Sequence, residues 1–391
     1  MHVLVLPSGY PTLSAPLGYL FFAEQARAFA RRGFKVGVVY PEIRSLRQLS
    51  PAALLESRLQ VEASFTPEGV QQLAWRAWNP GHARLRHRLF VSAARCLFQR
   101  YVSEHGKPDL IHCQGVMWGG IAGQALAEEF GLPFVVTLHS SAVLRGGLAL
   151  WKRALVTRTL AQAARVFAVS RALAAEASAL ALGAKIEVCP NFVDTDFFTG
   201  PERGPPTGPL SLLAVGRLIP LKGHDLLLAA LARSQSDAEL RLVGAGDQEP
   251  ALRAQARRLG LEGRVCFLGE LDRERLRQEY ERAHALVHPS RLETFGVVIV
   301  EALAMGLPVL ATACGGPQDI VTPDLGYLVP PDDVGCLTEA LNELQATYST
   351  HWISAGDHLR AVAVERYSDE SLVSRLGEVF RCVIGTKPGR G

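Results

Sequence analysis

The sequence lacks any close pairing of cysteines. Its seven cysteines are scattered and odd in number, and none belongs to a Cys-x-x-Cys motif. A disulfide framework or a structural zinc site needs cysteines at regular, closely spaced positions. The pattern therefore argues against both and favours reduced thiols in a cytoplasmic chain.

Long apolar runs and a strong excess of charge are also missing. No run is long enough to span a bilayer. The opening "MHVLVLPSGY" has a short apolar run without a cationic start, so we expect a first strand and not a signal peptide. The formal net charge is only +3, which gives no whole-molecule signal for nucleic-acid binding. We expect a cytoplasmic protein without a nucleic-acid partner, for which contact with a membrane surface stays open.

The 391 residues are 48% hydrophobic and 20% charged, a composition typical of a well-packed globular protein with two domains. Short β-rich runs such as "HVLVLP", "KVGVVYP" and "FVVTLHS" alternate with segments of helical spacing, which indicates βαβ units and parallel sheets. The alternation stops at a Pro/Gly-rich stretch and then restarts with "LSLLAVGRL". The sequence therefore predicts an α/β protein with domains at 1–198 and 210–365, a linker at 199–209, and a C-terminal helix at about 366–391.

Each half is expected to form a Rossmann-like, doubly wound sheet. Sheets of this kind bind ligands at the carboxyl ends of their strands. Two such domains facing each other would enclose a cleft, which is the usual place for an active site.

Two cations follow the first strand of the second half, in "VGRLIPLKG". Arg217 comes directly after the strand and Gly216, and Lys222 precedes a predicted helix start at His224. Cations beside a helix N-terminus suit a diphosphate, because the helix amides and dipole add to their charge. Arg can bind two phosphate oxygens and Lys supplies a point charge. The alternative is a pair of surface cations in a loop.

Two carboxylates bracket the apolar stretch "ETFGVVIVEALAMG". Glu293 follows a predicted strand, and Thr294, Phe295 and Gly296 lead into a helix that carries Glu301. This setting suits a nucleoside-diphosphate sugar, with one carboxylate accepting from sugar hydroxyls and the other from ribose hydroxyls. The alternative is two surface charges at the ends of a buried element.

Single residues of the first half also stand where ligands bind. His139 ends the strand "FVVTLHS", and a histidine there can bond a sugar hydroxyl or move a proton. His288 ends another strand and is its nearest rival. Gly18 lies in a loop where a backbone could approach a phosphate. "DTD" at 194–196 predicts a turn with local Asx hydrogen bonds, and we predict no metal site.

The segment 71–101 contains six arginines, including Arg76 and Arg100, with Trp75 and Trp78, but no Asp or Glu. A second acid-free stretch covers "LRGGLALWKRALVTR". Arginine with interfacial tryptophan is typical of a helix lying on an anionic membrane. The alternative is a solvated face with core aromatics.

Several motifs occur in a fixed order: "CPNFVDTDFF", "VGRLIPLKG", "LVGAGDQEPAL", "VCFLGEL", "HPSRLETFGVVIVEALAMGLPVLAT" and "GGPQDIV". Together they resemble the retaining, GT-B-fold glycosyltransferases of family 4. The likeness covers nearly the whole chain and is strongest from Leu212 to Val329. The N-terminal region looks most like bacterial members that act in exopolysaccharide or cell-surface glycan synthesis.

The resemblance implies a GT-B fold and a role for each candidate residue. It implies catalytic roles for His139, Arg217, Lys222 and Glu293, with the two cations on the donor diphosphate. It implies that the donor contacts Gly18, Gly216, Thr294, Phe295, Gly296 and Glu301. At Gly18 the family commonly has a Gly-Gly pair, whereas this chain has Leu17-Gly18.

The implied reaction is sugar transfer from a nucleotide sugar, UDP favoured over GDP, with retained anomeric configuration and without a cofactor or metal. The acceptor would be a glycan or polyprenyl-diphosphate-linked intermediate at the inner membrane face. The last helix would cross back onto the first domain. Alternatives are an epimerase or phosphorylase on the same fold, a transferase for a soluble small acceptor, and a non-catalytic nucleotide-sugar-binding protein.

Overall fold

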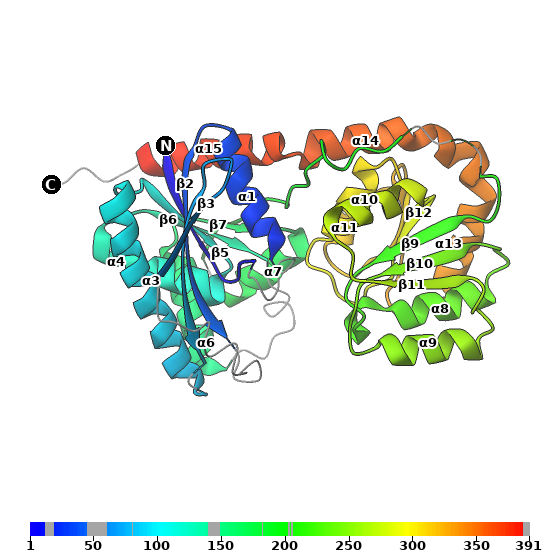
Figure 1. The fold of residues 1–391 in the computed structure, drawn as a ribbon, viewed down its shortest axis with the longest axis horizontal. Coiled ribbons are helices and arrows are strands. Elements are labelled where there is room, and N and C mark those ends of the chain that lie inside the picture. The colour runs from blue at the N-terminus through cyan, green and yellow to red at the C-terminus, as the bar shows by residue number, and fades with distance from the viewer. Residues whose placement is uncertain are drawn as a thin grey trace. The chain divides into compact units, whose positions relative to one another are not determined.

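The computed structural model describes residues 1–11, 19–44, 61–79, 81–139, 149–181, 183–201, 204 and 206–385. The chain forms two units, each with its own sheet (Figure 1). The first unit comprises residues 1–169, 173–189 and 372–391, and the second comprises 170–172 and 190–371. Both sheets are flanked by helices, so the predicted α/β class is confirmed.

The first unit contains an eight-stranded sheet in the order β3-β4-β2-β1-β5-β6-β7-β8. Only β3 and β4 pair antiparallel, and every other pair is parallel. The strands are β1 (His2–Pro7), β2 (Lys35–Arg44), β3 (Val61–Phe65), β4 (Gln71–Trp78), β5 (Leu110–Gln114), β6 (Phe134–Leu138), β7 (Arg165–Ala168) and β8 (Ile186–Val188).

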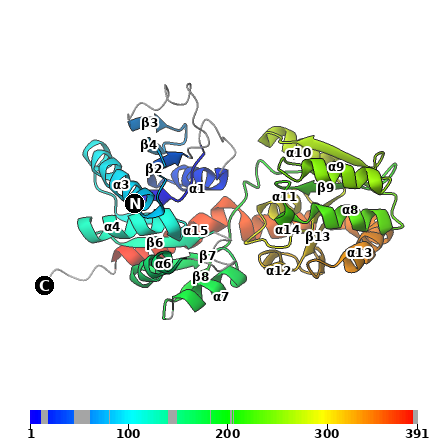
Figure 2. The same ribbon diagram turned by 90° about the horizontal axis from the view of Figure 1, so that it is seen from below.

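Helices cover both faces of this sheet (Figures 1 and 2). On one face, Phe29 and Phe380 stack with ring centroids 5.5 Å apart, and Phe380 also meets His112 of β5 at 5.2 Å. This contact fixes the C-terminal helix to the first unit. The helices of the unit are α1 (Leu20–Arg31), α3 (Ala83–His105), α4 (Ile121–Phe130), α6 (Leu150–Gln162), α7 (Arg171–Leu180) and α15 (Asp369–Gly385), with a π-helical turn η2 (Val116–Gly120) before α4.

The second unit contains a fully parallel six-stranded sheet in the order β11-β10-β9-β12-β13-β14. Its strands are β9 (Ser211–Val215), β10 (Glu239–Val243), β11 (Val265–Gly269), β12 (Ala285–His288), β13 (Val309–Thr312) and β14 (Gly326–Val329). The first of them, β9, lies in the run "LSLLAVGRL" with which the predicted alternation restarts. The inner strands β12 and β13 are buried along their whole length, so they read as apolar runs and not as alternating patterns.

Helices also cover both faces of the second sheet, with α8 and α9 on the face opposite α10 and α11 (Figure 1). Of two further helices, α13 packs on α8 and α14 packs on α11. The elements are η3 (Pro220–Lys222), α8 (His224–Arg233), α9 (Glu249–Arg258), α10 (Arg273–Arg282), α11 (Val297–Ala304), α12 (Pro317–Ile320), α13 (Val334–Thr347), η4 (Tyr348–Trp352) and α14 (Ile353–Tyr367).

Residues 190–198 belong to the second unit, ahead of the Pro/Gly-rich stretch at 199–209. The Val193 amide donates to the carbonyl of Tyr367 over 2.8 Å. Asp194 pairs with Arg273 at 3.0 Å and accepts from the Phe197 amide at 3.1 Å. The "DTD" stretch therefore forms the predicted Asx-type turn, and that turn is fastened to the second unit.

The segment 71–101 is not one helix, and that expectation was wrong. Its first eight residues form β4, which pairs with β2 from Gln71 to Trp78. Leu73 and Ala77 are buried, so this part of the segment belongs to the core. The composition could not reveal a strand because its polar positions are matched by partners from elsewhere in the chain.

Several arginines of the same segment form ion pairs with carboxylates that lie outside residues 71–101. Arg76 lies 2.8 Å from Glu42, and Arg95 lies 2.6 Å from Glu129. Arg100 pairs with a carboxylate one turn further along α3, at 2.7 Å. Within the described ranges, no helix has both the length and the apolar character needed to cross a bilayer.

Candidate active site

The predicted motifs of the second unit meet where its sheet reverses direction. The chain runs from β9 outward to β10 and β11, then continues with β12 on the other side of β9. Ligands of doubly wound sheets bind beside such a switch point, at the carboxyl ends of the strands. "VGRLIPLKG" follows β9 and "HPSRLETFG" follows β12, so both cross this point.

The two loops touch through their backbones. Gly223 has φ +65°, and a Cβ there would lie 2.0 Å from the carbonyl oxygen of Pro289. No other residue is tolerated at such a position without moving one of the loops. The Arg291 amide donates to the carbonyl of Leu221 over 2.8 Å. The loops therefore hold their side chains at a fixed separation.

An ion pair joins the two motifs. Lys222 Nζ lies 2.6 Å from Glu293 Oε2, and both side chains are mostly buried. The other carboxylate oxygen, Oε1, accepts from the amides of Thr294 and Phe295 at 2.9 and 3.4 Å. The Lys222 stem passes over Gly216, at 3.6 Å from where a Cβ would stand. Both acidic oxygens are thus held in place.

The surroundings of Glu293 keep it ionised. Burial alone would raise the pKa of Glu293, but His288 and Lys222 outweigh burial and hold that pKa well below its usual range. His288 is fully buried, with Nε2 3.4 Å from Glu293 Oε2. Burial lowers the pKa of His288, so this histidine is neutral near pH 7. Glu293 is therefore ionised near neutral pH, and its two carboxylate oxygens are hydrogen-bond acceptors.

A glycine turn from "CGGPQDIV" supports the Glu293 backbone from behind. The Glu293 amide donates to Cys314 O at 3.2 Å, and the Gly316 amide donates to Glu293 O at 2.8 Å. A Cβ at Gly316 would lie 2.4 Å from Phe295 Cα. Close backbone approach explains the need for glycine here and fixes the loop that carries the carboxylate.

The other predicted residues of the second unit contribute in different ways. Arg217 is exposed and forms no ion pair with the described residues, so its guanidinium is available to a ligand. The Phe295 side chain is buried, with its ring 5.9 Å from that of Tyr367, so only its backbone can face a ligand. Gly296 has φ +100° and precedes the first turn of α11.

Glu301 lies on α11 and is oriented by a buried phenol. The Tyr280 hydroxyl, from α10, donates to Glu301 Oε2 over 2.7 Å. Burial, then the Glu301 charge, raises the pKa of Tyr280, which keeps the phenol protonated and able to donate. The role of Tyr280 was not predicted from the sequence, because its position on a predicted helix does not indicate a contact with Glu301.

The first unit holds the remaining predicted residues. His139 follows β6, and its Nε2 lies 2.7 Å from Gln114 Oε1. The rings of Phe21 and Phe22 lie 5.2 and 4.9 Å from the imidazole. Gly18 lies outside the described residues.

Sequence reasoning missed Arg291, which links the two loops from the side. Its guanidinium donates to both oxygens of Asp225 at 2.8 Å, to Asp332 at 2.6 Å, and to the carbonyl of Pro220. Asp225 stands in the first turn of α8, directly after the Lys222 turn. The sequence did contain a signal for this link. An acidic residue, Asp225, stands at the start of a predicted helix, where negative charge is favourable, and Arg291 lies in a loop that follows a predicted strand.

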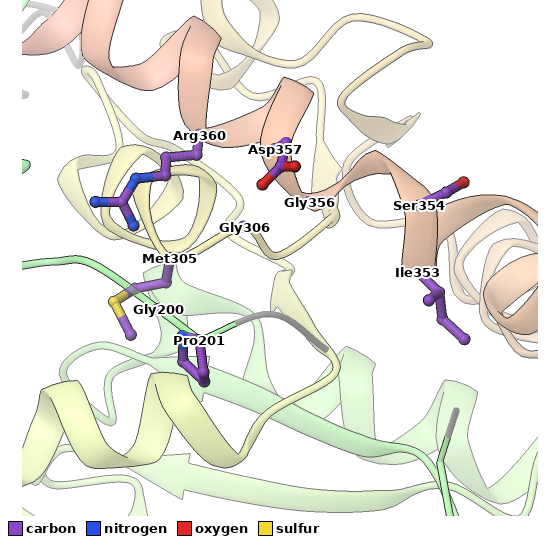
Figure 3. Close-up of a pocket in the computed structure, with 9 residues that line it drawn as sticks. All are labelled: Gly200, Pro201, Met305, Gly306, Ile353, Ser354, Gly356, Asp357 and Arg360. Atoms are coloured by element: carbon purple, nitrogen blue, oxygen red, sulfur yellow. The ribbon is translucent and has the colours of Figure 1, made fainter. Parts of the chain in front are cut away.

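A separate pocket of about 370 Å³ lies at the far end of α11 in the second unit. Figure 3 shows α14 residues, among them Asp357 and Arg360, on one side and the Gly200–Pro201 and Met305–Gly306 segments on the other. The described candidate residues do not line it. The pocket is therefore distinct from the Lys222–Glu293 site.

Two family models match the chain. The model described as Glycosyltransferase Family 4 matches residues 21–197, and the model described as Glycosyl transferases group 1 matches residues 199–351. A D-inositol 3-phosphate glycosyltransferase from Xylanimonas cellulosilytica is 30% identical over 84% of this chain and 82% of its own length. The chain belongs to the family 4 glycosyltransferases.

Other relatives of this glycosyltransferase are named for different activities. A glycogen synthase from Mycobacterium tuberculosis is 30% identical over 71% of this chain and 68% of the relative. A putative teichuronic acid biosynthesis glycosyltransferase, TuaC from Bacillus subtilis, is 26% identical over 88% and 89%. The family and the activity class are thereby shared, while the relatives' names refer to different products and pathways.

Solved structures share the fold. Sucrose-phosphate synthase from Thermosynechococcus elongatus superposes with a TM-score of 0.77 at 23% identity, covering 99% of each chain. HepE from Anabaena, in complex with UDP-glucose, gives a TM-score of 0.71 at 22% identity over 97% of this chain and 99% of that one. The predicted GT-B class is confirmed by these likenesses.

The Arg291–Asp225 link predicts a measurable coupling. We expect Arg291→Gln and Asp225→Asn each to lower the free energy of unfolding by about 1–2 kcal/mol, since both groups are only partly buried. The double variant should lose less than the sum, because each single change already breaks the bidentate pair. Urea unfolding of the four proteins measures this. Additive losses would contradict the link, and Arg258→Gln, at an exposed arginine of α9, serves as the control.

The depressed pKa of Glu293 predicts an acid-dependent stability difference. Glu293→Gln should be less stable than the wild type by about 1–3 kcal/mol at neutral pH, because charge-assisted bonds are lost. The Glu293 contribution is complete above the ordinary glutamate pKa of 4.5. It falls at lower pH, where the unfolded chain takes up a proton that the folded chain does not. Melting temperatures from pH 3 to 8 test this, and a gap that widens toward acid would refute it.

Proposed function

We propose that this glycosyltransferase moves a sugar from a UDP-sugar to a hydroxyl of a glycan or polyprenyl-diphosphate-linked acceptor, with retention of anomeric configuration and without a metal. The observation that carries the proposal is the Lys222–Glu293 pair at the switch point of the second sheet. A cation for the leaving diphosphate and a fixed acceptor for sugar hydroxyls stand side by side there. The solved relative that holds UDP-glucose supports a uridine donor.

In this mechanism the donor diphosphate binds Arg217 and Lys222. As the bond from the anomeric carbon to the phosphate oxygen lengthens, negative charge builds on the diphosphate and these cations stabilise it. Glu293, ionised and fixed, accepts from hydroxyls of the oxocarbenium-like sugar. The leaving phosphate oxygen takes the proton of the acceptor hydroxyl.

The second carboxylate, Glu301, binds the ribose hydroxyls of the nucleotide. Its orientation by the Tyr280 hydroxyl leaves the donor to meet a fixed acceptor group, which favours affinity because less side-chain freedom is lost. We assign His139 a place beside the transferred sugar, and this assignment rests on the resemblance to the family. Both roles are performed by side chains of this chain.

Donor binding and transfer are tested with purified full-length protein and a panel of UDP- and GDP-sugars. A UDP-sugar should raise the melting temperature most, since it binds only the folded state. Glu301→Ala should weaken UDP affinity by about tenfold to a hundredfold. Lys222→Ala should slow transfer by about a hundredfold or more, whereas Lys185→Ala, at an exposed lysine, should not.

The outcomes separate the parts of the proposal. If no nucleotide shifts the melting temperature, donor binding is wrong. Near-wild-type turnover in a folded Lys222→Ala protein contradicts the diphosphate role. NMR of the product anomeric proton decides between retention and inversion, and loss of transfer in a chelator contradicts metal independence.

We also propose that the start of α3 and of α6 lies on an anionic membrane at the cytoplasmic face. Leu85 and Leu150 expose 51% and 86% of their surface, and Arg84 and Arg88 are exposed beside Leu85. Apolar side chains flanked by arginine suit a headgroup region. This replaces the single amphipathic helix expected from residues 71–101.

Co-sedimentation with phosphatidylglycerol-containing vesicles tests this surface. The wild type should bind at low salt and be released at high salt, because the attraction is partly electrostatic. A Leu85→Ser, Leu150→Ser double variant should lose most of the binding. Leu259→Ser, which changes an exposed leucine of the second unit, should not. Absence of binding at low salt would reject the proposal.

A further inference from the structure

The first sheet has a switch point of its own, and a pocket lies there. Strand β1 is flanked by β2 on one side and β5 on the other, so the winding direction changes between β1 and β5. A pocket of about 170 Å³ is lined by Ser8 and Gly9, which follow β1, and by Trp118, which follows β5. Ligands of such sheets bind at this place, and the described candidate residues do not line it.

Arg86 of α3 lines this pocket. Its guanidinium carbon lies 4.4 Å from the centre of the Trp118 ring, a cation–π contact that holds the group beside the pocket. Partial burial, the single cause, lowers the pKa of Arg86 without neutralising it, because arginine stays charged in proteins. Among the described residues, no acid forms an ion pair with it. By contrast, Arg76, Arg95 and Arg100 of the same segment are paired.

A partly buried and unpaired cation is costly unless a ligand completes it. The lining of the pocket is otherwise aromatic, polar or apolar and contains no acid, with Tyr19 and Tyr40 among its residues. Arginine stacked on an aromatic ring presents its donors edge-on, in the fork geometry that matches phosphate. The missing partner is therefore an anion brought by the substrate.

The pocket is held in shape before any ligand arrives. Ser8 Oγ donates to Gly115 O at 3.1 Å and accepts from the Gly119 amide at 3.1 Å, which ties β1 to η2. A Cβ at Gly9 would lie 2.5 Å from the Tyr19 ring. Tyr19 itself has φ +57°, a strained value for a residue other than glycine. A preformed pocket loses little freedom on binding.

The two acid-free stretches of the sequence converge beside this pocket. His87 of α3 lies 6.1 Å from the ring of Trp118 and 6.2 Å from that of Trp151 on α6. Arg84 and Lys152 both lie over Trp151, at 5.8 and 5.6 Å. Their charges raise the local concentration of anions around Arg86.

We propose that this pocket binds a phosphate group of the sugar acceptor, with Arg86 as the anion-binding side chain. The inference rests on the proposed transferase function, because it assigns the acceptor side of that reaction. A volume of about 170 Å³ is below that of sites for whole drug-sized ligands, so the pocket takes one charged group and not a complete glycan. The phosphate belongs to a lipid-linked diphosphate or to a soluble sugar phosphate.

The test is calorimetric titration of the full chain in saturating UDP, which occupies the donor site. The probes are inorganic phosphate, glucose 6-phosphate, farnesyl phosphate and uncharged farnesol. Arg86→Gln should weaken binding of phosphate-bearing probes by about tenfold to a hundredfold, and Arg86→Lys should weaken it less. Arg381→Gln removes an equal charge from an exposed position on α15 of the same unit and should leave binding unchanged.

Every outcome bears on the proposal. Arg86-dependent binding of farnesyl phosphate alone supports a lipid-linked acceptor, and Arg86-dependent binding of glucose 6-phosphate or inorganic phosphate supports a soluble one. The proposal is overturned if no phosphate-bearing probe binds the wild type, or if the Arg86→Gln and Arg381→Gln proteins behave alike. Unchanged UDP affinity in the variants, measured first, shows that such a failure concerns the acceptor pocket and not the donor site.

Discussion

The ion pair between Lys222 and Glu293 is the constraint on which the second unit depends. Each partner is mostly buried, and each would be destabilising without the other. The pair can form only because two loops touch through Gly223 and Pro289. The adjacent glycine turn at 315–316 and the Arg291–Asp225 bridge then hold the loops from two further directions. The carboxylate is consequently fixed and ionised before any donor binds.

The switch points of the two sheets differ in how the charges beside them are balanced. In the second unit, Lys222 and Glu293 compensate each other, and the exposed Arg217 adds a cation that forms no ion pair with the described residues. In the first unit, Arg86 stands on Trp118 without a carboxylate among the described residues. A site that balances its own charge can bind a ligand with both anionic and hydroxyl groups, such as a nucleotide sugar. A site with an uncompensated cation selects for an anion.

Much of the fold could be predicted from the sequence because buried parallel strands read as short apolar runs between helical segments. The strands β3 and β4 were missed, since β4 carries arginine and glutamine and resembles part of a polar helix. Its charges are acceptable in a sheet only because Glu42, on the neighbouring strand, pairs with Arg76. Likewise, residues 190–198 contain no composition change that would assign them to the second unit, and only their contacts with Arg273 and Tyr367 do so.

The sequence by itself determined that this chain is a two-unit α/β glycosyltransferase, and which motifs stand at the strand ends. Motif order and apolar periodicity depend only on residues that are close together along the chain, so they can be read directly from the sequence. The tertiary structure alone decided that Lys222 meets Glu293, that Arg291 bridges the loops, and that Tyr280 orients Glu301. These pairs are separated by at least 21 residues along the chain, and parallel strands join neighbours that sequence spacing does not reveal.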